Sequence, residues 1–379
     1  MRENRFDQKI FSLWIFKADE SDPYIKKVKH VNVTWEEYRT AYYNDTFQIL
    51  RRLIGPDALI MSRPVDDGDE YSPHDIVFMG WVGDEEGSYD GLKKAVRYML
   101  DSGDKGYVGF GSDIGGYITN SRAGPLGRTK ELFLRWTAIG ALSSYMENGG
   151  LGEHLPWNFD DETTNVYRGW VNLHYKLVPY LYSEGTKVAI GKNGTLMRRC
   201  YDIETGGTQS YFLGPNVYVV PLYKDPAPGE RHLIWLPRSS TRQWINIFNT
   251  SITHPERRFL EDDASRLDRI PVYVEQNTLM PMYDMKHYPT LNAYRFVLWG
   301  KVIVDRTSTT LFTRDGQQWS IEMNGLEKTL TVRFIQQYDS KENEQWRWKF
   351  CQYVNGQEIC SENWIELKDN ASYRMENLI

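Results

Sequence analysis

Five polar residues in the first half of the chain each stand directly after a short apolar run. They are Asp19, Arg63, Asp84, Asp113 and Glu147, and successive ones are on average about 32 residues apart. The segments between the apolar runs have helical periodicity, over residues 35–54, 90–100, 129–142 and 163–182. Strands that alternate with helices predict parallel β/α units. A repeat of roughly 31 residues is typical of a (β/α)8 barrel, although an open doubly wound sheet with polar loop starts would give a similar pattern.

The pattern changes near residue 205, where short β runs separated by Pro and Gly replace the alternation. Farther on, Asp315-Gly316 and Asn355-Gly356 each predict a two-residue hairpin turn. We therefore predict an α/β part over residues 1–204, a proximal β-sandwich over 205–285 and a distal β-sandwich over 286–379.

Composition excludes several classes of protein. The 379 residues carry a net charge of −6 without any basic block, so we expect no nucleic-acid partner. No apolar stretch reaches 18 residues, so we expect no membrane span. Aromatic residues make up 14% of the chain. Most of them must serve the core, but some could stack on sugar rings.

Cysteines and glycosylation sequons bear on the compartment. Cys351 and Cys360 lie symmetrically about Asn355-Gly356 and so face each other across the predicted hairpin, in a non-hydrogen-bonded pair that permits a disulfide. The alternative is two half-buried thiols. The disulfide would fit the secretory pathway or the cell exterior, although the start of the chain carries no apolar signal segment. Asn-X-Ser/Thr sequons also favour that compartment and begin at Asn32, Asn44, Asn193, Asn249 and Asn370.

Asp19 and Asp84 are candidates for a catalytic pair. Their separation in the chain is close to two β/α units, and strand ends at that spacing face the same mouth of a barrel. Such ends could hold two carboxylates about 5 Å apart, the separation that a retaining glycosidase needs. Read singly, an Asp after a strand is more often a helix N-cap or a loop residue.

A glycine-rich segment and a histidine-containing loop bear on nucleotide, metal and serine-hydrolase chemistry. The glycine-rich segment 106–117 does not have the spacing of a dinucleotide loop, which disfavours a nucleotide-dependent enzyme. Its glycines better suit close approach of a ligand, with Asp113 accepting hydrogen bonds from sugar hydroxyls. His154 shares a loop with two acids and Trp157, but no ligand pair at helical spacing predicts a metal, and no Gly-x-Ser-x-Gly elbow is present.

At these residues the chain resembles glycoside hydrolase family 31, which holds α-glucosidases, α-xylosidases and their relatives. The motifs that carry the resemblance are FKAD at 16–19, SRP at 62–64, GWVGD at 80–84, GFGSDIGGY at 109–117 and ELFLRW at 131–136. Segments 212–221 and 270–281 look like that family's first C-terminal sandwich. The resemblance covers about residues 10–285, and the rest matches only in its general β character.

The resemblance implies a retaining mechanism with Asp19 as nucleophile and Asp84 as general acid/base, and no metal or cofactor. It places Arg63, Trp81 and Asp113 along the pocket for the terminal sugar. His154 is the nearest candidate for the family's sugar-contacting histidine, with Glu147 or Asn148 as alternatives because the loop departs from the usual pattern.

The position of Asp19 departs from the family. There the nucleophile follows the fourth barrel strand, whereas Asp19 is only nineteen residues into this chain. The resemblance therefore implies a partial (β/α)8 barrel, strands four to eight, without the family's N-terminal domain. We expect a retaining α-glycosidase acting on a carbohydrate with an α-linked terminal sugar, with another chain as a candidate source of the missing strands. The alternatives are a non-catalytic carbohydrate-binding or partner protein derived from such an enzyme, and an inactive fragment.

Overall fold

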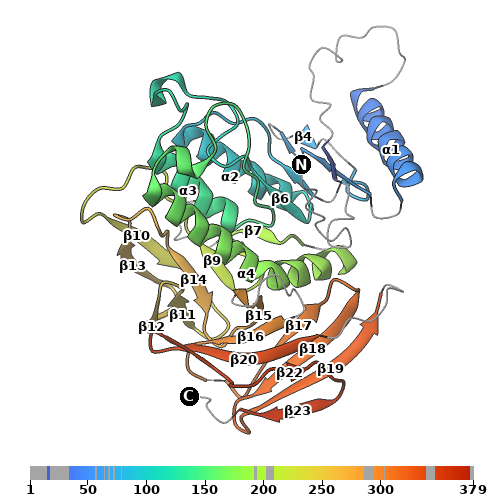
Figure 1. Ribbon diagram of the computed structural model, residues 1–379, viewed down its shortest axis with the longest axis vertical. Helices are drawn as coiled ribbons and strands as arrows, with labels where there is room; N and C mark the ends of the chain where they lie inside the picture. Colours follow the sequence, from blue (N-terminus) through green and yellow to red (C-terminus); the bar gives the residue numbers. More distant parts are fainter. Residues whose placement is uncertain are drawn as a thin grey trace, which may run out of the picture.

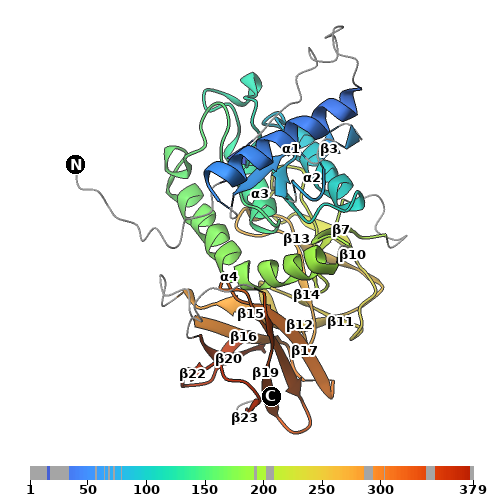
Figure 2. The same ribbon diagram turned by 90° about the vertical axis from the view of Figure 1, so that its right-hand side faces the viewer.

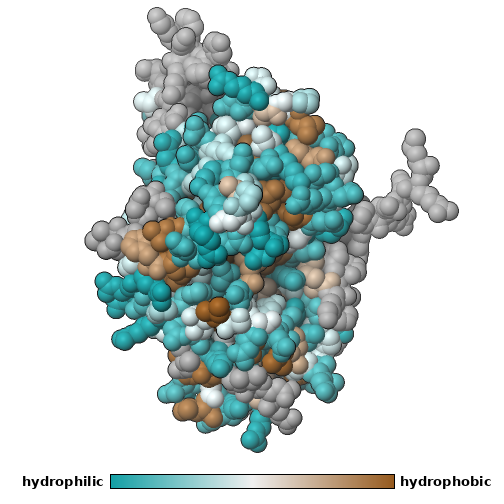
Figure 3. Space-filling view, turned by 90° about the vertical axis from the view of Figure 1, so that its left-hand side faces the viewer, coloured by the Kyte–Doolittle hydropathy of each residue, from teal (hydrophilic) through white to brown (hydrophobic). Residues whose placement is uncertain are grey.

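A computed structural model gives the fold, with an α/β part, two β parts and a long helix, α4, between them (Figures 1 and 2). The surface in Figure 3 is mostly hydrophilic, and its apolar side chains form separate groups. The structure describes residues 15–17, 34–55, 58–63, 65–66, 69–70, 73–77, 79–191, 194–201, 209–285, 293–302, 304–338 and 346–375.

A four-stranded parallel sheet forms the centre of the α/β part. Its order is β1-β2-β5-β6, with β1 at Ile15–Lys17, β2 at Leu59–Ser62, β5 at Met79–Trp81 and β6 at Gly109–Gly111. Four of the five predicted strands are therefore confirmed. The fifth, expected before Glu147, is present only as an isolated parallel bridge between Asp113 and Glu147. A short hairpin follows β2 and pairs two strands of two residues each, β3 (Val65–Asp66) and β4 (Asp69–Glu70).

The four predicted helices are present and begin at side-chain caps. They are α1 (Trp35–Leu53), α2 (Tyr89–Asp104), α3 (Lys130–Ala141) and α4 (Asp161–Gly191). Thr34 and Glu37 form a capping box at α1. The Ser88 and Thr129 hydroxyls each accept a hydrogen bond from a backbone amide in the first turn of α2 and α3. Within the described residues, no helix combines the length and apolar character needed to cross a membrane.

The proximal β region forms a six-stranded sheet and a two-stranded ribbon. The sheet order is β12-β11-β14-β9-β8-β7, and the ribbon pairs β10 with β13. The strands are β7 (Met197–Arg199), β8 (Tyr211–Leu213), β9 (Val217–Val219), β10 (Arg231–Leu236), β11 (Gln243–Asn246), β12 (Asn249–Pro255), β13 (Arg258–Asp263) and β14 (Val272–Glu275).

The distal β region consists of two facing sheets with a core of their own. One has the order β15-β16-β20-β21, with β22 also on β20, and the other is β17-β18-β19-β23. The strands are β15 (Leu279–Tyr283), β16 (Ala293–Trp299), β17 (Arg306–Phe312), β18 (Gln317–Asn324), β19 (Thr329–Gln337), β20 (Arg347–Val354), β21 (Gln357–Cys360), β22 (Ile365–Glu366) and β23 (Ala371–Arg374).

Two strand pairs cross the predicted domain boundaries. β7 pairs with β8 across residue 204, and β15 pairs with β16 across residue 285. One hydrophobic cluster also runs from α2 and α3 through α4 into the proximal sheet. Buried Arg135 on α3 reinforces this junction by donating to the backbone carbonyls of Ala264, Arg266 and Arg269. The boundaries at 204 and 285 remain predictions.

The predicted hairpin and disulfide near residue 355 are both confirmed. Asn355 and Gly356 have positive φ angles of 52° and 77°, the left-handed pair that a type I′ turn requires. Cys351 and Cys360 lie opposite each other on β20 and β21 and form a disulfide with a Cα–Cα distance of 4.0 Å. Cys200 is the free cysteine.

Candidate active site

Three adjacent parallel strands bring the predicted binding residues together at the carboxyl ends of the strands. Arg63 follows β2, Asp84 follows β5 and Asp113 follows β6, and β2-β5-β6 are neighbours. The Arg63 Nη2 atom donates to Asp84 Oδ2 at 3.1 Å. The Arg63 guanidinium carbon lies 5.4 Å from the centroid of the buried Trp81 ring, within cation–π range. The structure thus joins Arg63, Trp81 and Asp84 in one contact network.

The backbone at Gly83 makes this contact possible. Gly83 has a φ of +111°, a conformation that L side chains rarely adopt. A Cβ atom there would lie 3.0 Å from Arg63 Nη1. A side chain at position 83 would therefore be strained by this φ angle and would crowd the guanidinium that contacts Asp84.

Glu85, beside Asp84, is a buried acid that sequence reasoning missed. Its side chain is 3% exposed, and its Oε2 atom has no hydrogen-bond partner in the described part of the chain. Burial raises the pKa of Glu85 to about 8, against the opposing fields of Lys94 and Arg63. Burial therefore favours the protonated form of Glu85 at neutral pH. Asp84 is the more exposed acid of this adjacent pair, with a side-chain exposure of 37%. No sequence signal distinguished Glu85 from an ordinary loop acid.

Asp113 and Glu147 lie together beyond β6. Asp113 is 2% exposed, and its isolated bridge to Glu147 brings the loop after α3 alongside it. The Ile114 amide donates to the Glu147 carbonyl at 3.1 Å, and a Cβ on Gly149 would lie 3.9 Å from Asp113 Oδ1. The loop 147–149 therefore borders the Asp113 carboxylate, as expected for residues at neighbouring strand ends.

His154 is held by backbone rather than facing open space. Its Nδ1 lies 3.1 Å from the Ile114 carbonyl oxygen and its Nε2 3.2 Å from that of Leu151. Burial lowers the pKa of His154, which favours the neutral ring. The Asn148 amide in turn donates to the His154 carbonyl and to the Tyr167 hydroxyl. These contacts connect the 147–154 loop to the 113–117 loop and to α4.

Arg128 is a second residue that sequence reasoning missed. Its side chain is 1% exposed and donates to the carbonyls of Gly115, Gly116, Leu151 and Glu153. One buried guanidinium thereby joins the two loops that carry Asp113 and Glu147. A buried guanidinium needs acceptors for its N–H groups, and these four carbonyls supply them. An isolated arginine in a polar loop gave no sequence signal for this role.

Asp19 lies outside the described residues, two positions after the end of β1. The distance between the Asp19 and Asp84 carboxylates is therefore not part of the site geometry. The described groups provide a partly exposed carboxylate, a guanidinium supported by a buried indole, and a buried carboxylate, a set that suits hydrogen bonding with a polyhydroxylated ring.

The family resemblance is confirmed by comparison with known proteins. Residues 14–184 match the model described as the glycosyl hydrolases family 31 TIM-barrel domain. An α-xylosidase of Emericella nidulans is 24% identical over 287 residues, covering 70% of this chain and 34% of the relative. Alpha-xylosidase XylQ of Lactiplantibacillus pentosus is 31% identical over 199 residues, covering 50% of this chain and 24% of the relative. The chain thus spans about a quarter to a third of these relatives.

A solved structure extends the likeness of fold into both β regions. The family 31 α-xylosidase of Xanthomonas citri matches with a TM-score of 0.76 and 15% identity, over 98% of this chain and 44% of that one. The proteins of this fold combine a TIM barrel with β-sandwiches, and the observed parallel sheet and antiparallel sheets fit that plan. Residues 14–184 of this chain are accordingly similar to the barrel domain of glycosyl hydrolase family 31.

Proposed function

We propose that this chain carries the catalytic residues of a retaining α-glycosidase. The observation that carries the proposal is the Arg63–Asp84 contact at the ends of adjacent strands, within a segment that matches the family 31 barrel domain. Asp19 is the proposed nucleophile and Asp84 the proposed general acid/base. The substrate is a carbohydrate with an α-linked terminal sugar, which agrees with the names of the α-xylosidase and α-glucosidase relatives.

The proposed reaction has two steps. Asp19 attacks the anomeric carbon while Asp84 gives its proton to the leaving oxygen, which forms a covalent glycosyl-enzyme. Asp84 then removes a proton from water, and that water releases the sugar with its original anomeric configuration. Asp84 thus loses its proton in the first step and regains one from water in the second, while the bond between the sugar and Asp19 forms and then breaks, so the enzyme is unchanged after a cycle.

Arg63 has a positioning role in this proposal. Its hydrogen bond orients the Asp84 carboxyl at the end of the neighbouring strand. We propose that the same guanidinium binds a sugar hydroxyl, and that Trp81 and Asp113 hold the same sugar.

We propose Glu147 as the sugar contact at the last strand end. Both ring nitrogens of His154 lie within hydrogen-bond distance of backbone carbonyls, and the Asn148 amide donates to the His154 carbonyl and to the Tyr167 hydroxyl. Glu147 is half-buried and borders Asp113 through their bridge. His154 and Asn148 then serve to shape the loop, in place of the sugar contact expected for His154.

The open edge of the sheet favours completion of the barrel by further strands. Among the described residues, no strand pairs with the outer edge of β1, and the outer edge of β6 has only the Asp113–Glu147 bridge. An unpaired parallel edge is a ready surface for strand addition. We propose that the four strands and the segment bridged at Glu147 correspond to strands four to eight of a (β/α)8 barrel, and that another chain or another segment completes it. If nothing completes it, the second candidate, a non-catalytic carbohydrate-binding protein, applies.

Trapping the intermediate tests the mechanism. A fluorinated α-glycosyl fluoride that forms a slow glycosyl-enzyme should add one sugar mass to the chain, located on the peptide that contains Asp19. Labelling elsewhere, or hydrolysis with inverted configuration by NMR, would refute the assignment. Sugar binding without any label or turnover would favour the carbohydrate-binding candidate.

We also propose that the protein enters the secretory pathway. Its disulfide suits an oxidising compartment, and the sequon residues Asn44, Asn249 and Asn370 are exposed. Asn32 and Asn193 lie outside the described residues. Glycans removable by an amidase from protein made in secretory cells would support the proposal, and a reduced, unglycosylated native protein would contradict it.

A further inference from the structure

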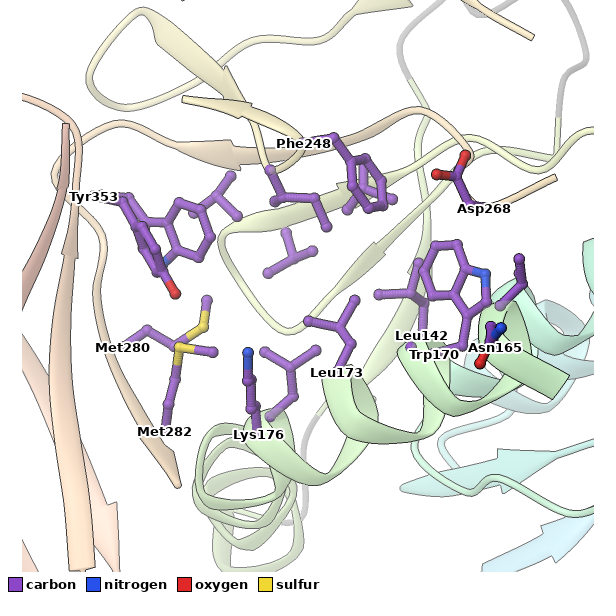
Figure 4. A pocket seen from close by; sticks show the side chains of 18 residues that line it. Leu142, Asn165, Trp170, Leu173, Lys176, Phe248, Asp268, Met280, Met282 and Tyr353 are labelled. Carbon is purple, nitrogen blue, oxygen red and sulfur yellow. The ribbon is translucent and has the colours of Figure 1, made fainter. Parts of the chain in front are cut away.

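A pocket of about 540 Å³ lies between α4 and the two β regions, apart from the candidate active site. Its size is that of a pocket for a small molecule, roughly 300–1,000 Å³. One wall is a stripe of α4 at helical spacing, including Val166, Trp170, Leu173 and Leu177. The proximal sheet and β15 supply the opposite wall, and Figure 4 shows Met280 and Met282 facing the end of Lys176.

Lys176 gives the pocket a hydrogen-bond donor. It extends from α4 into the pocket (Figure 4), and no hydrogen bond or ion pair joins it to another described residue. The Trp170 nitrogen lies on the side of Asn165, away from Lys176. Lys176 is therefore the donor that a ligand in the pocket can reach.

The charged groups near the pocket are favourable to an anion. Asp268, the carboxylate in the lining, is already paired with Arg266 through contacts of 2.8 and 2.5 Å. Arg269 lies over Phe248 in the same wall, with its guanidinium carbon 5.7 Å from the ring centroid. The charged neighbours of Lys176 are Arg295 and Asp284, and Asp284 is itself paired with Lys349 at 3.3 Å. Arg269 contacts the same Asp268 at 3.4 Å, and Arg295 is paired with Glu358. Among the described residues, Lys176 is therefore the lining cation without an ion pair.

We propose that this pocket binds an anionic amphiphile, a molecule with one carboxylate or sulfonate and a compact aliphatic or aryl body. The anion lies at Lys176, and the body fills the space between the apolar stripe of α4 and the sheets. Burial lowers the pKa of Lys176, and a bound anion would raise it again, so binding stabilises the charged lysine. The flexible side chains of Met280 and Met282 allow bodies of different shape to fit.

Binding of decanoate to the purified chain tests the proposal without any use of a glycoside. Below its micelle concentration, decanoate should bind once per chain in equilibrium dialysis and quench tryptophan fluorescence. Decanol and decyltrimethylammonium should bind far more weakly. Lys176→Met should weaken decanoate binding about 10- to 100-fold, the loss of one charge-assisted contact, and Lys176→Arg should restore most of it.

Gly169 allows the pocket to be closed without disturbing the fold. It lines the pocket in the middle of α4, and a Cβ there would meet no heavy atom within 4 Å. Gly169→Leu should abolish decanoate binding while the melting temperature holds or rises. Gly191→Leu is the matched control, because Gly191 also has open space but lies outside the pocket lining.

Two results would overturn the proposal. One is equal binding of the anionic, neutral and cationic probes, which would mean a merely apolar cavity. The other is unchanged decanoate binding in Gly169→Leu or Lys176→Met, which would place the ligand elsewhere. Neither result bears on the glycosidase proposal, since no active-site residue is changed and no turnover is measured.

Discussion

Arg63 donates to Asp84 across the ends of two adjacent parallel strands, at 3.1 Å, while its guanidinium also lies over the Trp81 ring. The arginine is largely buried, and the carboxylate is more exposed, with side-chain exposures of 11% and 37%. This arrangement fixes the position of the proposed acid/base before any substrate binds. It also leaves one face of the carboxylate open to solvent and to a ligand.

Removal of the Arg63 guanidinium should impair turnover of aryl α-glycosides by a chain with a complete barrel. Arg63→Met loses a charge-assisted contact to the sugar, so kcat/KM should fall about 10- to 100-fold. Arg63→Lys keeps the charge but not the two-pronged geometry, and should recover only part of the loss. Wild-type rates in Arg63→Met would contradict a role for this side chain in the pocket.

The stability of the protein should depend on the ionisation of Glu85. Its pKa is about 8 when folded, above the ordinary 4.5 of the unfolded chain. The folded state therefore holds the proton more tightly, and stability falls as pH rises between those two values. Glu85→Gln removes this dependence, so its melting temperature relative to wild type should rise from pH 5 to pH 8.5.

Glu86→Gln is the matched control for that comparison, because Glu86 is exposed beside Glu85. Its melting temperature should follow that of the wild type at both pH values. A constant difference between Glu85→Gln and wild type across this range would show that Glu85 is charged in the folded protein.

Two helical glycines should respond in opposite directions to the same substitution. Gly169→Ala places its Cβ in open space, so the gain in helix propensity should stabilise the protein by about 0.5–1 kcal/mol. Gly103→Ala on α2 would bring a Cβ to 2.4 Å from the Met197 carbonyl oxygen, a clash with backbone that propensity cannot offset. Thermal denaturation of both variants measures this, and stabilisation by Gly103→Ala would contradict the packing of α2 on β7.

The disulfide should be visible in thiol counts. Denatured protein without reductant should show one thiol, that of Cys200, and three after reduction. A Cys351→Ala, Cys360→Ala double variant should lose about 2–3 kcal/mol of stability through the freed unfolded chain. Three thiols in the unreduced native protein would contradict the bond.

The sequence predicted the elements better than the roles of individual side chains. Regular strand-helix alternation located four strands and four helices, and the symmetry of Cys351 and Cys360 about a turn located the disulfide. The fifth predicted strand is present only as a single bridge, because the apolar run before Glu147 is only two residues long. Glu85, Arg128 and the backbone contacts of His154 depend on which loops meet in space, and no local pattern records that.

The most direct test of the central claim is the hydrolysis of aryl α-xylosides and α-glucosides by Asp84→Ala in a chain with a complete barrel. If Asp84 is the acid/base, the variant should lose far more activity on poor leaving groups than on activated aryl glycosides. Azide should restore turnover and yield an α-glycosyl azide, because the small anion replaces the water that needs a base. Equal losses on all leaving groups, with no azide product, would contradict the assignment of Asp84.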